Sequence, residues 1–136
     1  MRILLDTNVF ISGIFFSGPP AQILKAWKDR KIQIVLSKEI LIEYQRIGDA
    51  LSSKYSEIDI LPIIDLLTIY GEVVETRDIS VSISVDPDDN KFIECAIVSN
   101  CKLIVSGDKH LLNVSGFQGI EVLKPREFID LKFHRF

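Results

Sequence analysis

The stretch RILLDTN, residues 2–8, sets the expectation for the whole fold. Its first four residues, RILL, are a short apolar run typical of a buried strand, and Asp6 follows the run at once. The first strand of a doubly wound parallel sheet usually lies at the centre, and ligands bind outside the carboxyl ends of such strands. An acid at that tip suits a functional role about as well as a structural one. The polar residues that follow the other strands are therefore the next to compare.

Downstream of this stretch, short β-rich runs alternate with helical patterns, which predicts βαβ units and a parallel sheet. A loop rich in Gly, Ser and Pro is expected after the first strand. The expected strands are Arg2–Leu5, Gln33–Leu36, Glu72–Glu75, Lys102–Val105 and Ile120–Leu123, with Ile79–Val85 as a further strand or an extended connector. The expected helices are Pro20–Lys31, Ser37 to about Ala50, Leu61–Tyr70, one that starts in DPDDN (residues 86–90), a short one after Asp108, and REFIDL after Pro125. We expect one α/β domain over residues 1–136.

The composition fits a compact fold. The chain has 136 residues and is 47% hydrophobic, which is enough for a sizeable core. No apolar run approaches the roughly 20 residues that span a membrane, and an acid at position 6 comes too early for a signal peptide, so a cytoplasmic location is expected. The net charge of −3 gives no overall basic footprint for nucleic acid. Cys95 and Cys101 are expected to be buried thiols.

Two acids outside the first strand have plain structural explanations as well as functional ones. Asp108 follows the fourth expected strand in IVSGDKH, residues 104–110, where it could be the N-cap of a short helix. Glu43 shares a helical face with Glu39 and Arg46, and such a set usually forms a solvated salt-bridge stripe.

The run DPDDN places three acids just before the apolar segment FIECAIV. Asp86 and Pro87 fit the N-cap and first position of a helix. Asp88 and Asp89 would then lie against the positive end of the helix dipole. Asp89 is nevertheless as good a candidate for a ligand as for a helix-start residue, because its helix opens on the same edge of the sheet as Asp6.

Together, the four candidate acids point to metal chemistry. Carboxylates that converge on one end of a sheet repel one another unless divalent cations bind between them, and oxygen ligands suit Mg²⁺ or Mn²⁺. Paired ions of this kind serve phosphodiester hydrolysis, because they hold the phosphate, lower the pKa of the attacking water and stabilise the leaving oxygen. The sequence has no Gly-rich nucleotide loop, no HExxH and no G-x-S-x-G motif.

In this order the motifs resemble those of the PIN-domain nucleases: LLDTNVF at 4–10, SKEILIEYQRI at 37–47, DPDDNKFIECA at 86–96 and IVSGDKHLL at 104–112. The similarity covers nearly the whole chain and looks closest to small prokaryotic PIN proteins that are toxins of toxin–antitoxin pairs. The resemblance implies a three-layer PIN-like α/β fold, with a central five-stranded parallel sheet flanked by helices. It also implies a Mg²⁺- or Mn²⁺-dependent endoribonuclease that hydrolyses RNA phosphodiester bonds.

Position by position, the resemblance assigns the catalytic and metal-binding acids to Asp6, Glu43, Asp89 and Asp108. Asp89 is chosen within its run because it stands seven residues before Ala96, as the family's acid stands before its small helix residue. The polar positions that surround the site are Thr7, Asn8 and Ser106. No role is assigned to the extra acids Asp86, Asp88 and Glu94.

Accessory contacts to RNA are open to two interpretations each. Lys91, Lys102 and Lys109 could neutralise neighbouring phosphates or could be solvated surface residues. Phe15 or Phe16 could stack on a base, or both could pack their loop onto the core.

Two other function classes stay open. A haloacid-dehalogenase-like phosphatase also places an Asp after its first strand, but it needs a second Asp two residues on, where this chain has Asn8. A non-catalytic PIN-like module would bind RNA or protein without cutting. The expected partners are an RNA substrate, an antitoxin protein and, through the apolar helix at Leu61–Leu67, a second copy of the chain.

Overall fold

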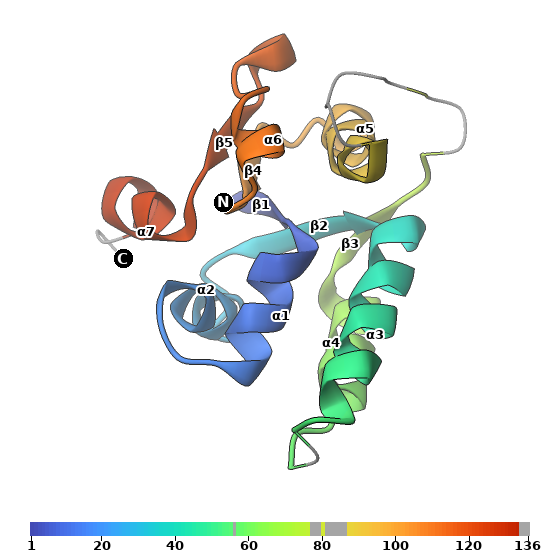
Figure 1. Ribbon diagram of the computed structural model, residues 1–136. Coiled ribbons are helices and arrows are strands. Elements are labelled where there is room, and N and C mark those ends of the chain that lie inside the picture. The colour runs from blue at the N-terminus through green and yellow to red at the C-terminus, as the bar shows by residue number, and fades with distance from the viewer. Residues whose placement is uncertain (56, 77–79, 81–86, 134–136) are drawn as a thin grey trace.

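The fold is built on one parallel sheet (Figure 1). The computed structural model describes residues 1–55, 57–76, 80 and 87–133. In this part of the chain five parallel strands form the sheet, which confirms the predicted α/β architecture. The strands are β1 (Arg2–Leu5), β2 (Gln33–Ser37), β3 (Glu72–Val74), β4 (Leu103–Val105) and β5 (Glu121–Leu123). Their order, β3-β2-β1-β4-β5, places RILL at the centre, so the strand order reverses beside β1.

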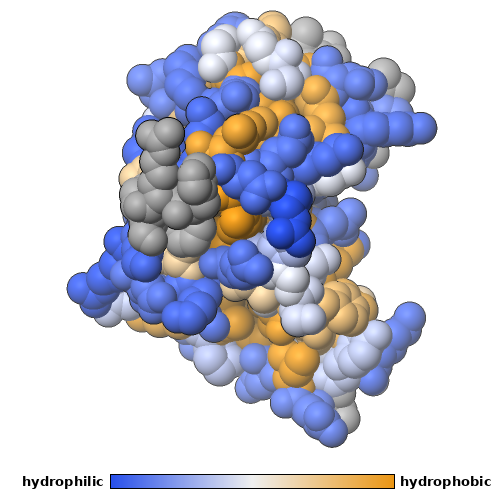
Figure 2. Space-filling view, turned by 90° about the vertical axis from the view of Figure 1, so that its left-hand side faces the viewer, coloured by the Kyte–Doolittle hydropathy of each residue, from blue (hydrophilic) through white to orange (hydrophobic). Residues whose placement is uncertain are grey.

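Helices cover both faces of the sheet and complete three layers (Figure 1). One face carries α5 (Asn90–Ser99). The opposite face carries α1 (Thr7–Phe15), α2 (Pro19–Lys28), α3 (Lys38–Ser52) and α4 (Leu61–Tyr70). Two short helices, α6 (Lys109–Leu112) and α7 (Pro125–Phe128), follow β4 and β5. On the side that carries α2 and α7, patches of apolar surface lie among hydrophilic side chains (Figure 2). Among the described residues, no helix has both the length and the apolar character needed to cross a membrane.

Helix α1 is the main correction to the sequence prediction. A loop was expected after the first strand, but Thr7–Phe15 is helical and buries Val9, Phe10 and Ile11. Because α2 and α3 both pack against it, α1 is apolar around much of its surface and lacks the one-sided 3.6-residue pattern that marks an amphipathic helix. Gly13 permits the close approach of α2, since a Cβ there would lie 2.7 Å from the Leu24 side chain.

Other elements differ from the prediction at their ends. Helix α2 ends at Lys28 instead of Lys31, because Arg30 adopts a left-handed backbone with φ of 63°. Helix α5 begins at Asn90, after a single 3₁₀ turn at Pro87–Asp89, so the helix starts three residues later than expected. The expected Asp86 cap and the Ile79–Val85 segment lie outside the described residues, apart from Ser80.

The core beneath the central strand is closed by an aromatic pair. Ile3, Leu4 and Leu5 of β1 are fully buried. Tyr44 of α3 is also fully buried; its ring stacks on Phe10 with a centroid separation of 4.2 Å, and its hydroxyl donates to the Leu5 carbonyl. The residue before Asp6 is therefore held from both α1 and α3.

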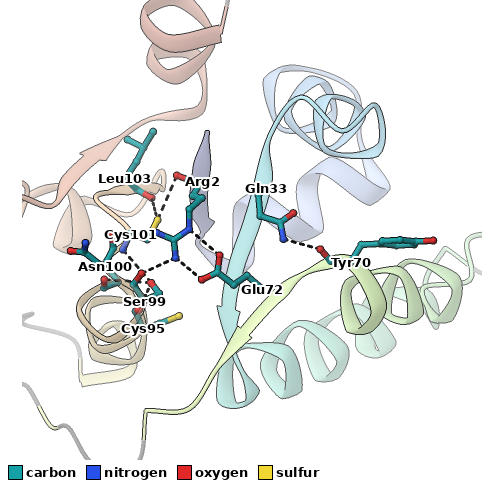
Figure 3. Close-up of polar contacts among 10 residues, drawn as sticks. Arg2, Gln33, Tyr70, Glu72, Cys95, Ser99, Asn100, Cys101 and Leu103 are labelled. Atoms are coloured by element: carbon teal, nitrogen blue, oxygen red, sulfur yellow. Dashed lines mark hydrogen bonds and ion pairs between the residues drawn. The ribbon is translucent and has the colours of Figure 1, made fainter.

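At the amino edge of the sheet, where the strands begin, opposite charges pair (Figure 3). Arg2 on β1 donates from Nε to Glu72 Oε1 on β3 at 2.9 Å, and its NH2 group binds the other carboxylate oxygen. The same guanidinium donates to the Ser99 carbonyl at 2.7 Å and to the Asn100 carbonyl, at the end of α5. A cation is favourable there because the helix C-terminus carries partial negative charge. One side chain thus joins β1, β3 and α5.

Candidate active site

Asp6 lies where the central strand passes into α1, at the carboxyl edge of the sheet. Its backbone N–H donates to the Val105 carbonyl of β4 at 3.0 Å, which extends the β1–β4 pairing to this residue. The side chain is buried, with 6% of its surface exposed, and it makes no capping hydrogen bond to α1. Instead, Oδ2 accepts a hydrogen bond from Ser106 Oγ at 2.7 Å. The carboxylate therefore faces β4 and the residues that follow it.

Ser106 connects Asp6 to Asp108. Ser106 is fully buried, and its Oγ also accepts the backbone N–H of Asp108 at 2.9 Å. Asp108 Oδ1 in turn accepts the backbone N–H of His110 at 2.9 Å, which confirms Asp108 as the N-cap of α6. One hydroxyl thus links the Asp6 carboxylate to the backbone of Asp108, 102 positions further along the chain.

Glu43 enters the site from α3. Its Oε2 accepts a hydrogen bond from Thr7 Oγ1, and its Oε1 lies 2.6 Å from Lys91 Nζ at the start of α5. Arg46 approaches the same carboxylate more loosely, at 3.9 Å. The Glu43 side chain is only 16% exposed and that of Lys91 only 22%. Glu43 is therefore part of an enclosed contact between α1, α3 and α5, and not of a solvated stripe.

Asp89 ends the 3₁₀ turn and stands at the N-cap position of α5. It is 5% exposed, and the next residue, Asn90, is also buried. Two residues on, Lys91 contacts Glu43, so the first turn of α5 adjoins the Thr7–Glu43 contact. The structure thus brings Asp6 and Asp108 together through Ser106, joins Glu43 to the same region through Thr7, and places Asp89 beside Lys91.

The electrostatics of Asp6 reflect this gathering of acids. Burial is the main cause that raises the pKa of Asp6 above its ordinary value of 3.8. The negative charges of Asp108 and Glu43 raise this pKa further, whereas hydrogen bonds from Ser106 and the Thr7 backbone oppose the rise. A positive charge bound beside Asp6 would relieve both the desolvation and the repulsion.

The type of the donor atoms at this site suits a divalent ion, but their spacing does not yet form a complete set of ligands. The donors are hard carboxylate oxygens, which Mg²⁺ and Mn²⁺ prefer. Within the described residues, however, no three His, Cys, Asp or Glu side chains lie close enough together to form a complete ligand set. The acids lie in one region and repel one another, so the distances between their carboxylates would have to shorten for all of them to bind one ion.

The remaining predicted residues divide. Thr7 and Ser106 bond to the acids, whereas Asn8 is exposed. Lys102 donates to the Gln118 carbonyl, away from the acids, and Lys109 is exposed on α6. The rings of Phe15 and Phe16 both pack against Tyr55.

Sequence reasoning did not foresee two of these contacts. The Lys91–Glu43 pair joins residues 48 positions apart, and only the helical placement of both could have hinted at it. The buried Tyr44 beneath Leu5 left no signal beyond its place on the apolar face of its helix. Burial raises the pKa of Tyr44 well above 10.0, so its hydroxyl remains a donor.

These features define a class: a parallel α/β domain with buried acids at the carboxyl edge, around a central first strand. The family model for the PIN domain matches residues 2–110, so this chain belongs to the PIN domain family. No curated protein matches the chain. PIN domains are typically nucleases and generally use divalent metal ions.

Proposed function

We propose that this protein is a Mg²⁺- or Mn²⁺-dependent endoribonuclease that hydrolyses RNA phosphodiester bonds, and that it is the toxin of a toxin–antitoxin pair. The observation that carries the proposal is Asp6, a buried acid that Ser106 links to Asp108 and that two other carboxylates repel. Such an arrangement opposes folding, so it indicates a site shaped by chemistry. Membership of the PIN family supports a nuclease reaction.

The acids have separate roles in this proposal. Asp6, Asp89 and Asp108 would hold the ion, and Glu43 would help to hold or recruit a second. A bound ion supplies positive charge to the scissile phosphate and lowers the pKa of a nearby water. Ser106 orients both Asp6 and Asp108, since its single hydroxyl donates to one and accepts from the backbone of the other.

Lys91 supplies a fixed positive charge beside the acids. Both oxygens of Glu43 already have partners, Thr7 and Lys91, and the ammonium group is largely enclosed. We infer that Glu43 positions Lys91 so that the ammonium group meets a phosphate of the incoming strand. Lys91 then reduces the repulsion between the RNA backbone and the cluster of carboxylates.

The domain extends past the family match in this proposal. Strand β5 pairs with β4 in the same sheet, and the Ser106 backbone N–H donates to the Leu123 carbonyl at 2.9 Å. The residue that orients Asp6 is thus itself fixed by β5. We infer that residues 1–136 act as one nuclease domain. The toxin role and an antitoxin partner rest on the resemblance to small prokaryotic PIN proteins.

The test is cleavage of a 5′-labelled single-stranded RNA in Mn²⁺, Mg²⁺ or EDTA. The wild-type protein is expected to cut in either metal and not in EDTA. Asp6→Asn and Asp89→Asn are expected to reduce the rate by roughly a hundredfold or more, because each removes a charged ligand. Asp65→Asn is the matched control, since Asp65 is an exposed acid on α4 and should leave the rate unchanged.

Four outcomes would contradict the proposal. Cleavage in EDTA, or cleavage that survives both site substitutions, excludes the metal mechanism. Turnover of a phosphomonoester without RNA cleavage identifies a phosphatase. RNA or protein binding without any turnover identifies a non-catalytic module.

The toxin role has its own measurement. Induced expression of the wild-type chain in a bacterial host is expected to arrest growth, and expression of Asp6→Asn to equal levels is not. Growth arrest by both chains would mean that toxicity does not come from the acidic site.

A further inference from the structure

A second region suited to a ligand lies at the amino edge of the sheet, remote from the acids. It is a hollow of about 520 Å³, which falls in the range of roughly 300–1,000 Å³ typical of small-ligand sites. It lies between the end of α2, the starts of β1 and β2, and the last turn of α4. Its apolar lining includes Trp27, Ile32, Leu66 and Tyr70.

The charged lining of this hollow is entirely positive. Lys28, Arg30 and Lys31 contribute to it, and no carboxylate among the described residues does. The one acid in this segment, Asp29, pairs with Lys25 at 3.0 Å and not with a lining residue. None of the three lining cations forms an ion pair with a described residue, although the chain as a whole has a net charge of −3. The hollow therefore favours an anion.

The helix dipole alone does not account for these cations. The last carbonyls of α2 already accept backbone hydrogen bonds: Lys25 from Asp29, Trp27 from Arg30, and Ala26 from Lys31. Lys28 lies in the final turn, where a cation is favourable, but Arg30 and Lys31 lie beyond the end of the helix. Their position over the hollow needs another reason.

Arg30 and Tyr70 provide it. Arg30 closes α2 with a left-handed backbone, a position that glycine usually occupies at the end of a helix. The guanidinium carbon of Arg30 lies 5.8 Å from the centre of the Tyr70 ring, and Tyr70 is 54% exposed. The Tyr70 carbonyl accepts a hydrogen bond from Gln33 Nε2 at 2.9 Å, while the ring extends away from Gln33 (Figure 3). A flat aromatic surface is thus held next to a set of cations.

We propose that this hollow binds a nucleoside phosphate. The base lies against Tyr70 and the apolar lining, because aromatic side chains accept any base by stacking. The phosphate meets Lys28, Lys31 and Arg30. The acids lie at the opposite edge of the sheet, so the hollow binds without cutting. The bound nucleoside phosphate is either a free nucleotide or one unit of an RNA strand that is cut at the acids. The site can exist whether or not the protein is a nuclease.

Trp27 makes the proposal directly measurable, because it is the one tryptophan in the sequence and it lines the hollow. The full-length protein in EDTA is titrated with AMP, with ATP and with a ten-nucleotide RNA, and tryptophan emission is followed. Each ligand that enters should change the emission with a saturable curve that weakens as salt rises. A response to the mononucleotides identifies a free nucleotide as the source, and a response to the RNA alone identifies an anchored strand.

Reversing the charge of lining residues tests whether binding depends on this hollow and not on other parts of α2. The double substitution Lys28→Glu, Lys31→Glu should weaken binding roughly tenfold or more, and Tyr70→Ala should weaken it about five- to tenfold. Lys25→Glu is the matched control, because Lys25 lies on the same helix but pairs with Asp29 outside the lining. Lys28→Gln, Lys31→Gln provides the same test without new negative charge, and circular dichroism melts confirm that each variant folds.

The proposal is overturned if neither mononucleotide nor RNA changes the emission at millimolar concentration. It is also overturned if Lys25→Glu weakens binding as much as the double substitution does. A polyglutamate peptide that produces the same response as RNA would show a general anion surface and not a nucleoside phosphate site. If Trp27 responds while no RNA is cut in Mn²⁺, the nucleotide site holds and the nuclease proposal fails.

Discussion

Charged side chains at the two ends of the central strand interact in opposite ways. At the amino edge, the charges of Arg2 and Glu72 pair with each other, and Arg2 also donates to two carbonyls at the end of α5. At the carboxyl edge, Asp6 lies close enough to Asp108 and Glu43 that both raise its pKa. The Arg2–Glu72 pair therefore stabilises the fold, whereas the repulsion among the acids at the carboxyl edge destabilises it. Removing a charge should accordingly have opposite effects on stability at the two edges.

The largest expected effect is at the carboxyl edge. Asp6→Asn should reduce metal-dependent RNA cleavage by roughly a hundredfold or more, because it removes a ligand charge. The same change should raise the thermal midpoint at pH 7 without metal by roughly 3 °C, because a buried, repelled charge is lost. Calorimetry and an RNA cleavage assay measure the two effects. A lower midpoint would mean that the Asp6 charge stabilises the fold, and the contrast between the edges would fail.

The next effect is at the amino edge. Arg2→Met should lower the free energy of unfolding by about 1–2 kcal/mol, because Glu72 and two carbonyls of α5 lose their donor. This figure allows for the partial exposure of the ion pair, in which both side chains are 37% exposed. Urea denaturation measures it. Lys25→Met, which removes an exposed i,i+4 pair, is the control and should cost less than about 0.5 kcal/mol.

The Arg2→Met variant also tests the comparison of the two edges in the RNA cleavage assay. Its cleavage rate per folded molecule should equal that of the wild-type protein, since Arg2 lies at the opposite end of β1 from Asp6. A rate loss greater than the loss of folded protein would show that the two edges are coupled.

A smaller effect concerns pH. The pKa of Asp6 is raised in the folded protein, so the folded state holds its proton more tightly than the unfolded chain does. The stability that this provides is fully present below about 3.8 and is lost as the pH rises through the raised pKa. Without metal, Asp6→Asn should therefore gain stability over the wild-type protein as the pH increases from 4 to 7. Urea midpoints across this range measure the difference. A constant difference would indicate that Asp6 titrates normally.

The smallest effect is on the thiols beside Arg2. Burial raises the pKa of Cys95 to about 12 and also raises that of Cys101. Neither thiol should react with an aromatic disulfide reagent at pH 8 unless the structure opens. Arg2→Met should accelerate the reaction a few-fold, whereas Asp6→Asn should not. Immediate reaction in the wild-type protein would contradict the buried positions of both thiols.

The positions of the strands could be predicted, because each strand is a short β-rich run. The central place of RILL followed from the topology rule for the first strand. Helix α1 could not be predicted in this way: its residues are covered by α2 and α3, so the apolar positions do not form one stripe. The end of α2 could not be predicted either, because its left-handed residue is Arg30 and not the glycine that usually marks such a position.

The candidate site shows a similar division. Asp6, Asp89 and Asp108 could be proposed because each follows a strand or starts a helix, and the structure places them at such positions. Glu43 lies inside its helix and was proposed only through the resemblance to the PIN-domain nucleases. The contacts between side chains could not be predicted. The Lys91–Glu43 and Thr7–Glu43 contacts depend on how α1, α3 and α5 pack, which no local pattern encodes. A salt-bridge stripe with Arg46 was a reasonable local interpretation of Glu43, and only burial distinguishes it from the enclosed contact observed.

The link from Asp6 through Ser106 to Asp108 also has a consequence for synthesis on the ribosome. The hydrogen bond joins residues separated by a hundred positions, and it forms only when β4 has paired with β1. Contacts of such long range form late, since the chain between them must first be ordered. A growing chain therefore carries its first acid long before that acid has partners. If the protein cuts RNA, a chain that is still being translated cannot do so until β4 has been synthesised and has paired with β1.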